Sequence, residues 1–264
     1  FRRGLSHAIN RERLNQVVWH GLSRPQNAAI TDESWHFDSP RGEKVREEWI
    51  NSFVEFDPEL AREYLERAGL TEFDAEGYRM FKGEPFQIVL ETFDDPIAVD
   101  ESQMIQEDWR NVGIRVYTRR STSTDISRRI REAEFDMYMQ HNSEMDLFTF
   151  PEAVFPVTPN IWHPKIGRYY ATGGEEGEAP EGFMAELIKL YEEAKTTRDI
   201  QARHDLVLNA INIHIEEGPF MLGTTGRQID LVVLKDYFRN VPETGILGPW
   251  AICQPGSKFP EQFY

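Results

Sequence analysis

Apolar residues recur along the first part of the chain with the spacing of amphipathic helices. Residues 1–22 carry two such stripes, and Asn10 is placed to cap the second of two helices there. A further helix is expected to begin at Asp57, which precedes a proline and so suits an N-cap, and to end at Gly69. The intervening residues 23–43 are rich in Pro, Gly, Asn, Asp and Ser, which predicts a surface loop.

From residue 86 the period changes to the alternation of apolar and polar residues that is typical of strands. Strands and helices then follow one another, with strands predicted around 86–90, 114–118 and 135–139 and helices around 105–112 and 122–132. This order, with short connections, favours right-handed crossovers and parallel strands. The predicted fold class is therefore α/β, with a mixed, largely parallel sheet flanked by helices.

The second half of the chain is less regular. Residues 141–180 contain five prolines and a glycine cluster, and we expect an irregular loop with a functional role there. Helical spacing returns in two helices that begin near residues 183 and 197. Short apolar runs at 220–222 and 231–234 are predicted to be buried strands.

Charge and cysteine content narrow the class of protein. The 264 residues include 29 basic and 45 acidic side chains, a net charge of −16, which disfavours nucleic acid as a partner. Cys253 is the only cysteine, so neither an intramolecular disulfide nor a cysteine-cluster metal site is possible. No apolar run approaches the roughly 18–20 residues of a membrane-spanning helix. The chain also opens directly on a helical pattern, without the apolar region of a signal peptide.

Motifs that carry common catalytic chemistry are absent from the sequence, including HExxH, GxSxG, the Walker loop and a nucleotide-binding GxGxxG. The glycine cluster at 173–177 is acidic and would repel phosphate. His204 and His214 lie ten residues apart on one predicted helix, too far to share a metal, and His214 is expected to be a partly buried, hydrogen-bonded side chain. We therefore expect a protein that is not an enzyme, without catalytic residues, metal or cofactor. A hydrolase that uses two of the many carboxylates is the alternative.

A polar cluster follows the third predicted strand. It consists of Gln140, His141, Asn142, Ser143, Glu144 and Asp146. Open α/β sheets bind ligands at the carboxyl ends of their strands, so this cluster is a candidate ligand-contacting loop in which an acid accepts a hydrogen bond or pairs a cation. An ordinary solvated strand exit explains the same residues equally well.

Three aromatic residues and one cation in the long loop are further candidates. Trp162 is favoured as a ring that stacks on a ligand, whereas Tyr169 and Tyr170 are favoured as anchors of the loop to the core. Arg168 either pairs an anionic group of a ligand or pairs one of the many nearby acids.

Several segments carry a family resemblance through their order. The first are FRRGLSHAINRE at 1–12, FDPELA through AGL at 56–70, GEPF at 83–86, NVGI at 111–114 and FDM at 135–137. The later ones are RYYATGG at 168–174, GTTG at 223–226, RNVPE at 239–243 and PEQF at 260–263. Together they resemble the family 5 extracellular solute-binding proteins, the dipeptide- and oligopeptide-binding class of ABC importers.

The resemblance implies a fold, a function and a location. The fold would be a periplasmic-binding-protein-like type II lobe. The opening helix resembles a segment from the middle of the full-length proteins, so the chain would be a C-terminal half that lacks the export signal. Residues 1–226 would form the C-terminal ligand-binding lobe, and residues 227–264 the hinge crossover that completes the missing lobe. The protein would bind a peptide or small solute in the periplasm or outside the membrane, and its partners would be the permease subunits of an importer.

One departure from the family pattern concerns the ligand. Peptide-binding relatives often carry a W-x-x-D-Y-P-D-P-like run after the third strand, whose acid captures the peptide amine. The corresponding run here is NSEMDLFT at 142–149, in which Asp146 takes the place of that acid without the flanking Tyr and Pro. An oligosaccharide or another solute therefore stands as an alternative to a peptide.

Overall fold

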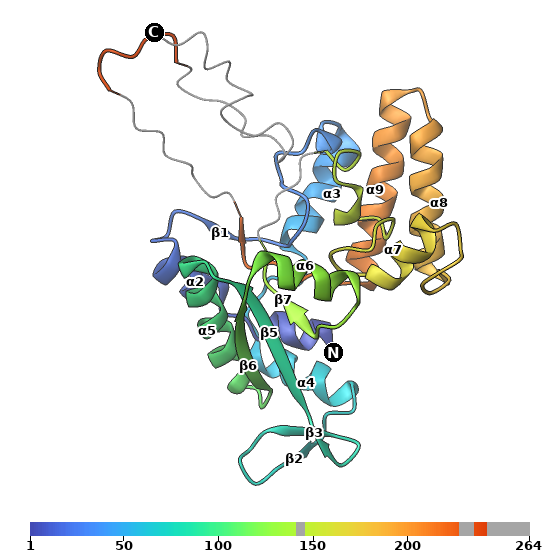
Figure 1. Cartoon of the computed structure of the whole chain (residues 1–264). Coiled ribbons are helices and arrows are strands. Elements are labelled where there is room, and N and C mark those ends of the chain that lie inside the picture. Colours follow the sequence, from blue (N-terminus) through green and yellow to red (C-terminus); the bar gives the residue numbers. More distant parts are fainter. Residues whose placement is uncertain (141–145, 227–234, 242–264) are drawn as a thin grey trace.

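The computed structural model describes residues 1–140, 146–226 and 235–241, and a parallel three-stranded sheet lies at the centre of one half (Figure 1). The strand order is β6-β5-β7, with β5 (Gln87–Phe93), β6 (Arg115–Ser121) and β7 (Met137–Tyr138). The central strand pairs in parallel with both neighbours, so that Ile88 lies opposite Val116 and Leu90 opposite Met137. The predicted α/β class with parallel strands is confirmed.

The two crossover helices, α5 (Pro96–Arg110) and α6 (Ser123–Arg131), cover opposite faces of this sheet. Leu90 of β5 belongs to the same apolar cluster as Trp109 of α5. The next residue, Glu91, accepts a hydrogen bond from Arg129 of α6 at 3.0 Å. Successive strand residues point to opposite faces, which places the two helices on the two sides.

Three helices from the first part of the chain pack in the sheet half, α1 (Arg2–His7), α2 (Arg11–Val18) and α4 (Pro58–Arg67). The helical pattern over residues 1–22 is interrupted at residues 8–10, where Asn10 caps α2 by accepting a hydrogen bond from the amide of Arg13. Asp57 caps α4 by accepting from the amides of Glu59 and Leu60. Both predicted N-caps are confirmed.

The remaining strands form two small antiparallel sheets. One contains β2 (Glu72–Phe73), β3 (Arg79–Phe81) and β4 (Glu84–Pro85), and the other pairs β1 (Arg24–Pro25) with β8 (Thr225–Gly226). The prediction of a buried strand at 220–222 is wrong. The ring of Phe220 stacks on Trp162 there, and Gly223 lies so close to the backbone of residues 26–28 that a Cβ would clash. The run at 231–234 lies outside the described residues.

The other half of the molecule is helical (Figure 1). It contains α3 (Pro40–Asn51), α7 (Pro164–Ala171), α8 (Phe183–Thr196), α9 (Ile200–Glu217) and two short 3₁₀ helices, η1 (Trp35–Phe37) and η2 (Pro151–Ala153). The two helices predicted from residues 183 and 197 are confirmed as α8 and α9.

Of two loop predictions in this half, the first is wrong and the second is wrong mainly at residues 164–171. Residues 23–43 are not a surface loop, because Ile30 and Phe37 are buried and α3 begins at Pro40, where the Ser39 hydroxyl accepts a hydrogen bond from an amide of the first turn. Residues 141–180 include α7, which also begins at a proline. A proline fits the first turn of a helix as well as it fits a loop, so these prolines marked helix starts.

Two apolar clusters form the interior. We call them the sheet core, built mainly from α1, α2, α4, β5, α5 and β6, and the helical core, built from α3, α8, α9 and residues 147–166. Arginines of the first helices connect the two. Arg2 donates to the carbonyl of Pro219 at 2.6 Å and Arg3 to that of Gly218 at 2.9 Å, just beyond the end of α9. The fully buried Arg11 donates to the carbonyl of Gly223 at 2.8 Å.

The predicted division of the chain at residue 226 stays a prediction. Residues 227–234 and 242–264, which were expected to form the crossover and to complete a second lobe, lie outside the described residues.

Candidate functional site

The candidate ligand loop begins where β7 ends. Gln140 is exposed at its start, and His141, Asn142 and Glu144 lie outside the described residues. Asp146 closes the loop with a tight turn, in which its carboxylate accepts hydrogen bonds from the amide of Phe148 and the hydroxyl of Thr149, both at 3.0 Å. The acid is therefore held in a fixed orientation by its own turn.

His36 supports this turn from η1, 110 residues earlier in the sequence. Its Nε2 accepts a hydrogen bond from the amide of Leu147 at 3.1 Å and lies 3.6 Å from Oδ1 of Asp146. The side chain is only 2% exposed, and the edge of its ring faces Phe148. Burial, together with nearby His204, lowers the pKa of His36 to about 4, although Asp146 opposes that shift. The ring is therefore neutral at physiological pH.

The hydrogen bond to Leu147 also fixes the tautomer of His36. Because Nε2 accepts a hydrogen bond from a backbone amide, the proton of the neutral ring resides on Nδ1. That Nδ1 is buried and has no hydrogen-bond partner among the described residues. His36 thus presents a lone pair to the Asp146 turn and an N–H group on its other side.

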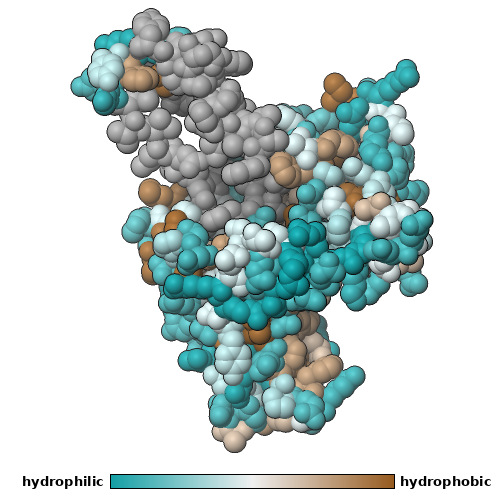
Figure 2. Space-filling view, viewed as in Figure 1, coloured by the Kyte–Doolittle hydropathy of each residue, from teal (hydrophilic) through white to brown (hydrophobic). Residues whose placement is uncertain are grey.

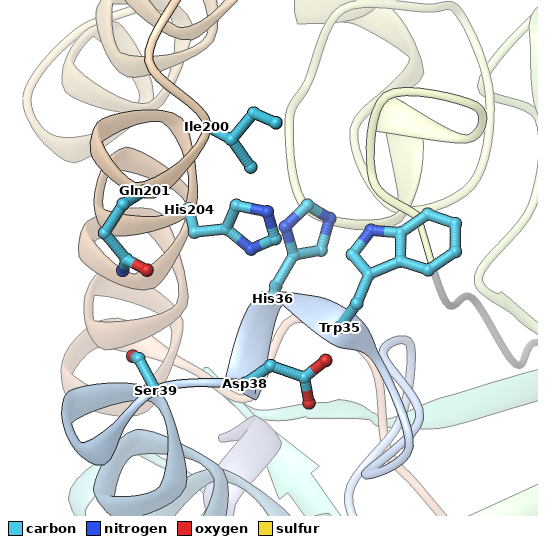
Figure 3. Close-up of a pocket in the computed structure, with 7 residues that line it drawn as sticks. All are labelled: Trp35, His36, Asp38, Ser39, Ile200, Gln201 and His204. Carbon is cyan, nitrogen blue, oxygen red and sulfur yellow. The ribbon is translucent and has the colours of Figure 1, made fainter.

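His36 also lines an open pocket of about 380 Å³ between η1 and the start of α9. Figure 3 shows the imidazoles of His36 and His204 next to each other at its centre, and their ring centroids are 4.9 Å apart. Trp35 lies beside the two imidazoles and Asp38 below them, while Ile200 and Gln201 come from α9. The pocket and the Asp146 turn therefore contact the same imidazole.

Trp162 and Arg168 have no hydrogen bond or ion pair with Asp146, and both are bound to other parts of the protein. The indole nitrogen of Trp162 donates to the carbonyl of Glu152 at 3.0 Å, and its ring stacks on Phe220 with centroids 4.7 Å apart. Arg168 on α7 donates to the carbonyl of Arg131 and to the carboxylate of Glu132. The structure thus brings Asp146 together with His36, and it does not bring Asp146 together with Trp162 or Arg168.

Tyr170 and His214 take the structural positions that were expected for them. The hydroxyl of Tyr170 bonds to Glu192 and Lys195 of α8 and so fastens α7 to that helix. His214 is fully buried, and its Nε2 bonds to the carbonyl of Val154 at 2.7 Å. Burial lowers the pKa of His214 to about 4. Both side chains therefore belong to the scaffold.

Sequence reasoning missed Trp35, His36, Asp38 and Gln201, because the first three fall in the segment predicted to be a surface loop. A signal was present in the run Trp35-His36-Phe37, where three rings in succession are unusual for a solvated loop. His204 was noted only for its distance from His214. In the described ranges, no three His, Cys, Asp or Glu side chains form a group that could hold a metal ion.

Solved structures with the same fold extend over most of this chain. The oligopeptide-binding protein OppA is 28% identical with a TM-score of 0.74, and the match covers 92% of this chain and 39% of OppA. MelB from Agrobacterium fabrum, in complex with stachyose, is 18% identical with a TM-score of 0.69, covering 85% of this chain and 33% of MelB. AppA from Bacillus subtilis, in complex with a nonapeptide, is 18% identical with a TM-score of 0.61, covering 84% and 41%. These matches confirm the type II binding-protein fold, and the chain spans well under half the length of each protein.

The sequence was also compared with curated proteins and with protein families. No match was found among curated proteins. No helix in the described ranges has the length and apolar character needed to cross a membrane. Residues 1–154, more than half of the chain, match the middle region of one family. The chain therefore belongs to the bacterial extracellular solute-binding proteins, family 5.

Proposed function

We propose that the whole protein binds a solute outside the cytoplasm and delivers it to the permease subunits of an ABC importer. The observation that carries the proposal is the family assignment over residues 1–154, together with the likeness to OppA over 92% of the chain. Family 5 proteins are binding proteins, and the proposed work of this one is to bind and release, with no bond made or broken.

The proposed ligand wall is the carboxyl end of β7 and the loop that follows it. Gln140, His141, Asn142, Glu144 and Asp146 would contact the ligand, since open α/β sheets bind ligands at this end of their strands. Asp146 is oriented for the task by its own turn, and His36 supports the turn by accepting a hydrogen bond from the amide of Leu147. Trp162 and Arg168 are proposed as further ligand contacts, secondary to these because their polar groups already have protein partners.

This chain would supply one side of a cleft, and the remainder of the protein would supply the other. In such receptors a solute stabilises the closed arrangement of two lobes because it binds that arrangement better than the open one. Two ligand classes are proposed: a peptide or a related small solute, since OppA and AppA are described as oligopeptide-binding proteins, or an oligosaccharide, since MelB is described in complex with stachyose.

A thermal-shift screen of the full-length protein against peptides, oligosaccharides and amines tests the proposal. A true ligand at 100 times its Kd stabilises the protein by about 2.7 kcal/mol through mass action. The Asp146→Ala variant should lose most of the affinity for the best ligand, whereas Asp100→Ala, at an exposed acid of α5 without a side-chain hydrogen bond or ion pair in the described ranges, serves as a control. Unchanged affinity in Asp146→Ala would show that the site is misplaced, and turnover of a screened compound would favour an enzyme.

A further inference from the structure

The pocket between η1 and α9 has the size and rim of a binding site. Its volume of about 380 Å³ falls within the roughly 300–1,000 Å³ of ligand pockets. Two large apolar side chains at its edge remain in solvent, Trp35 at 41% exposed and Ile200 at 68% exposed. A single exposed apolar residue is ordinary on a protein surface, but two that border one polar pocket offer a platform for a ligand.

The polar side chains of the pocket have unused hydrogen-bonding capacity. Asp38, Gln201 and His204 make no side-chain hydrogen bond or ion pair with other residues in the described ranges, and neither does the indole nitrogen of Trp35. They combine an acceptor, an amide that both donates and accepts, an imidazole and a donor. Figure 3 shows Asp38 and Gln201 on different sides of the paired imidazoles, so these groups surround the centre of the pocket.

The chemistry of the side chains that line the pocket argues against ionic ligands. A metal ion needs a lone pair on Nδ1 of His36, but that nitrogen carries the proton, because Nε2 accepts from Leu147. An anion would meet Asp38 in a pocket that no Lys or Arg lines. An organic cation would find a single carboxylate next to two imidazoles. What remains is a neutral ligand whose polar groups each donate and accept.

We propose that this pocket binds a neutral sugar ring, with its C–H face against the indole of Trp35 and its hydroxyls bonded to Asp38, Gln201 and His204. Each sugar hydroxyl is both a donor and an acceptor, which suits this mixed set, and an exposed indole suits the apolar face of a sugar. The assignment rests on the proposed solute-binding function and names its ligand class. His36 lines the pocket and accepts the hydrogen bond from Leu147, so the pocket adjoins the Asp146 turn.

Calorimetric titration of the full-length protein with maltose, cellobiose and stachyose, and with trialanine as the peptide probe, tests this assignment. At least one of the three saccharides should bind. Trp35→Ala should weaken that binding at least tenfold, and Asp38→Asn should weaken it severalfold. Trp35→Phe should retain part of the affinity because it keeps a ring. Phe81→Ala removes a similarly exposed ring from the remote β2-β3-β4 sheet and should leave the affinity unchanged.

The indole ¹H–¹⁵N resonance of Trp35 gives a second measurement that does not depend on a variant that folds poorly. This resonance, assigned with Trp35→Phe, should shift as the saccharide saturates the protein. Binding of trialanine without any saccharide, or saccharide binding that leaves the Trp35 resonance unmoved, would overturn the sugar assignment and leave the solute-binding function standing. If neither class of probe binds, and a wider solute library gives no thermal shift, the solute-binding function itself fails.

Discussion

The sheet half and the helical half of the molecule differ in how their cores are assembled from the sequence. The sheet core takes β5, α5 and β6 from one continuous stretch of chain, packed against the first helices. The helical core takes its residues from four separate segments, at 29–49, 147–166, 184–190 and 207–211. Local periodicity therefore describes the first core well, whereas the second depends on contacts between distant segments.

Their buried polar groups differ as well. In the sheet half, Glu91 is only 1% exposed and is paired with Arg119 at 2.8 Å and Arg129 at 3.0 Å, so its charge is compensated. In the helical half the fully buried polar rings are neutral, His214 against a carbonyl and His36 against an amide. Acid should therefore weaken the helical half through its histidines.

Removing the largest side chain of the sheet core should have the largest effect. Trp109 is almost fully buried, and its indole nitrogen donates to the carbonyl of Leu5 at 2.9 Å. Trp109→Ala should lower the free energy of unfolding by about 3–5 kcal/mol through the cavity it leaves. Urea denaturation followed by circular dichroism measures this loss.

Leu208→Ala in the helical core is the matched variant, with an expected loss of about 2–5 kcal/mol. If Arg2, Arg3 and Arg11 couple the two cores into one cooperative unit, both variants should shift a single unfolding transition. Two separated transitions, each moved by one variant only, would show that the halves unfold independently.

The buried histidines predict a loss of stability in acid. The pKa of His214 is about 4 in the folded protein and 6.5 in the unfolded chain, so the unfolded chain binds more protons between these values. Stability is therefore fully present above pH 6.5 and falls as the pH drops from 6.5 to 4. One pKa unit is worth about 1.4 kcal/mol, which gives a loss of about 3 kcal/mol for this histidine.

His214→Gln can keep a donor for the carbonyl of Val154 but does not titrate, so its stability should depend less on pH between 4 and 6.5. Urea midpoints at pH 7, 6, 5 and 4 provide the comparison. His20→Asn, at an exposed position whose positive φ suits Asn, should behave as the wild type does. If His214→Gln loses as much stability in acid as the wild type, the buried histidine is not the cause.

Most of the sheet half could be predicted because each of its elements satisfies one simple period. Ile88 and Leu90 are both buried as alternation predicts, and Asn10 and Asp57 are N-caps with their predicted side-chain bonds. The helical half was harder, because Pro40 and Pro164 were read as loop residues although each occupies the first turn of a helix. Proline is compatible with a loop and with the first turn of a helix, and only the contacts of the following residues distinguish the two structures.

The candidate site was predictable only in part, for a related reason. Asp146 could be placed from its position after a predicted strand. His36, in contrast, reaches the same turn from a sequence distance of 110 residues, and its role comes from a single amide hydrogen bond. Trp162, favoured as a ligand-stacking ring, packs on Phe220, a contact to a segment that had been predicted to be a strand. Residue types indicated candidate chemistry, but long-range packing determined which groups have protein partners.

His36 offers a test of whether the helical half orients the ligand loop of the sheet half. His36→Leu removes the acceptor and leaves the buried amide of Leu147 unpaired, which should cost about 1–3 kcal/mol. His36→Gln, whose amide oxygen can accept in place of Nε2, should recover much of that loss. The affinity of the full-length protein for its best solute should follow the same order.

A readout specific to this role is the imidazole tautomer. The ¹⁵N chemical shifts of His36 should report the proton on Nδ1 at pH 7, as the bond from Leu147 requires. A proton on Nε2, or equal solute affinities for the Leu and Gln variants, would mean that His36 fills space without orienting the Asp146 turn.

The smallest effects are expected at the helix caps, one in each half. Asp57 caps α4 by accepting from two amides, and Asp199 caps α9 by accepting from the amide of Ala202 at 2.8 Å. Each Asp→Ala change should lower the free energy of unfolding by about 1 kcal/mol, with Asp57 at the upper end because it serves two donors. Asp57→Asn and Asp199→Asn keep the acceptor and should lose only a few tenths of a kcal/mol, the part that comes from charge at a helix N-terminus. Because both caps act locally, with Asp199 exposed and Asp57 half-buried, they probe coupling between the halves without disturbing either core. In one cooperative unit, hydrogen exchange of the slowest amides in both cores should accelerate equally for the two Ala variants. If Asp199→Ala accelerates exchange in the helical core alone, the arginine bonds between the halves do not couple them, and the helical half opens by itself.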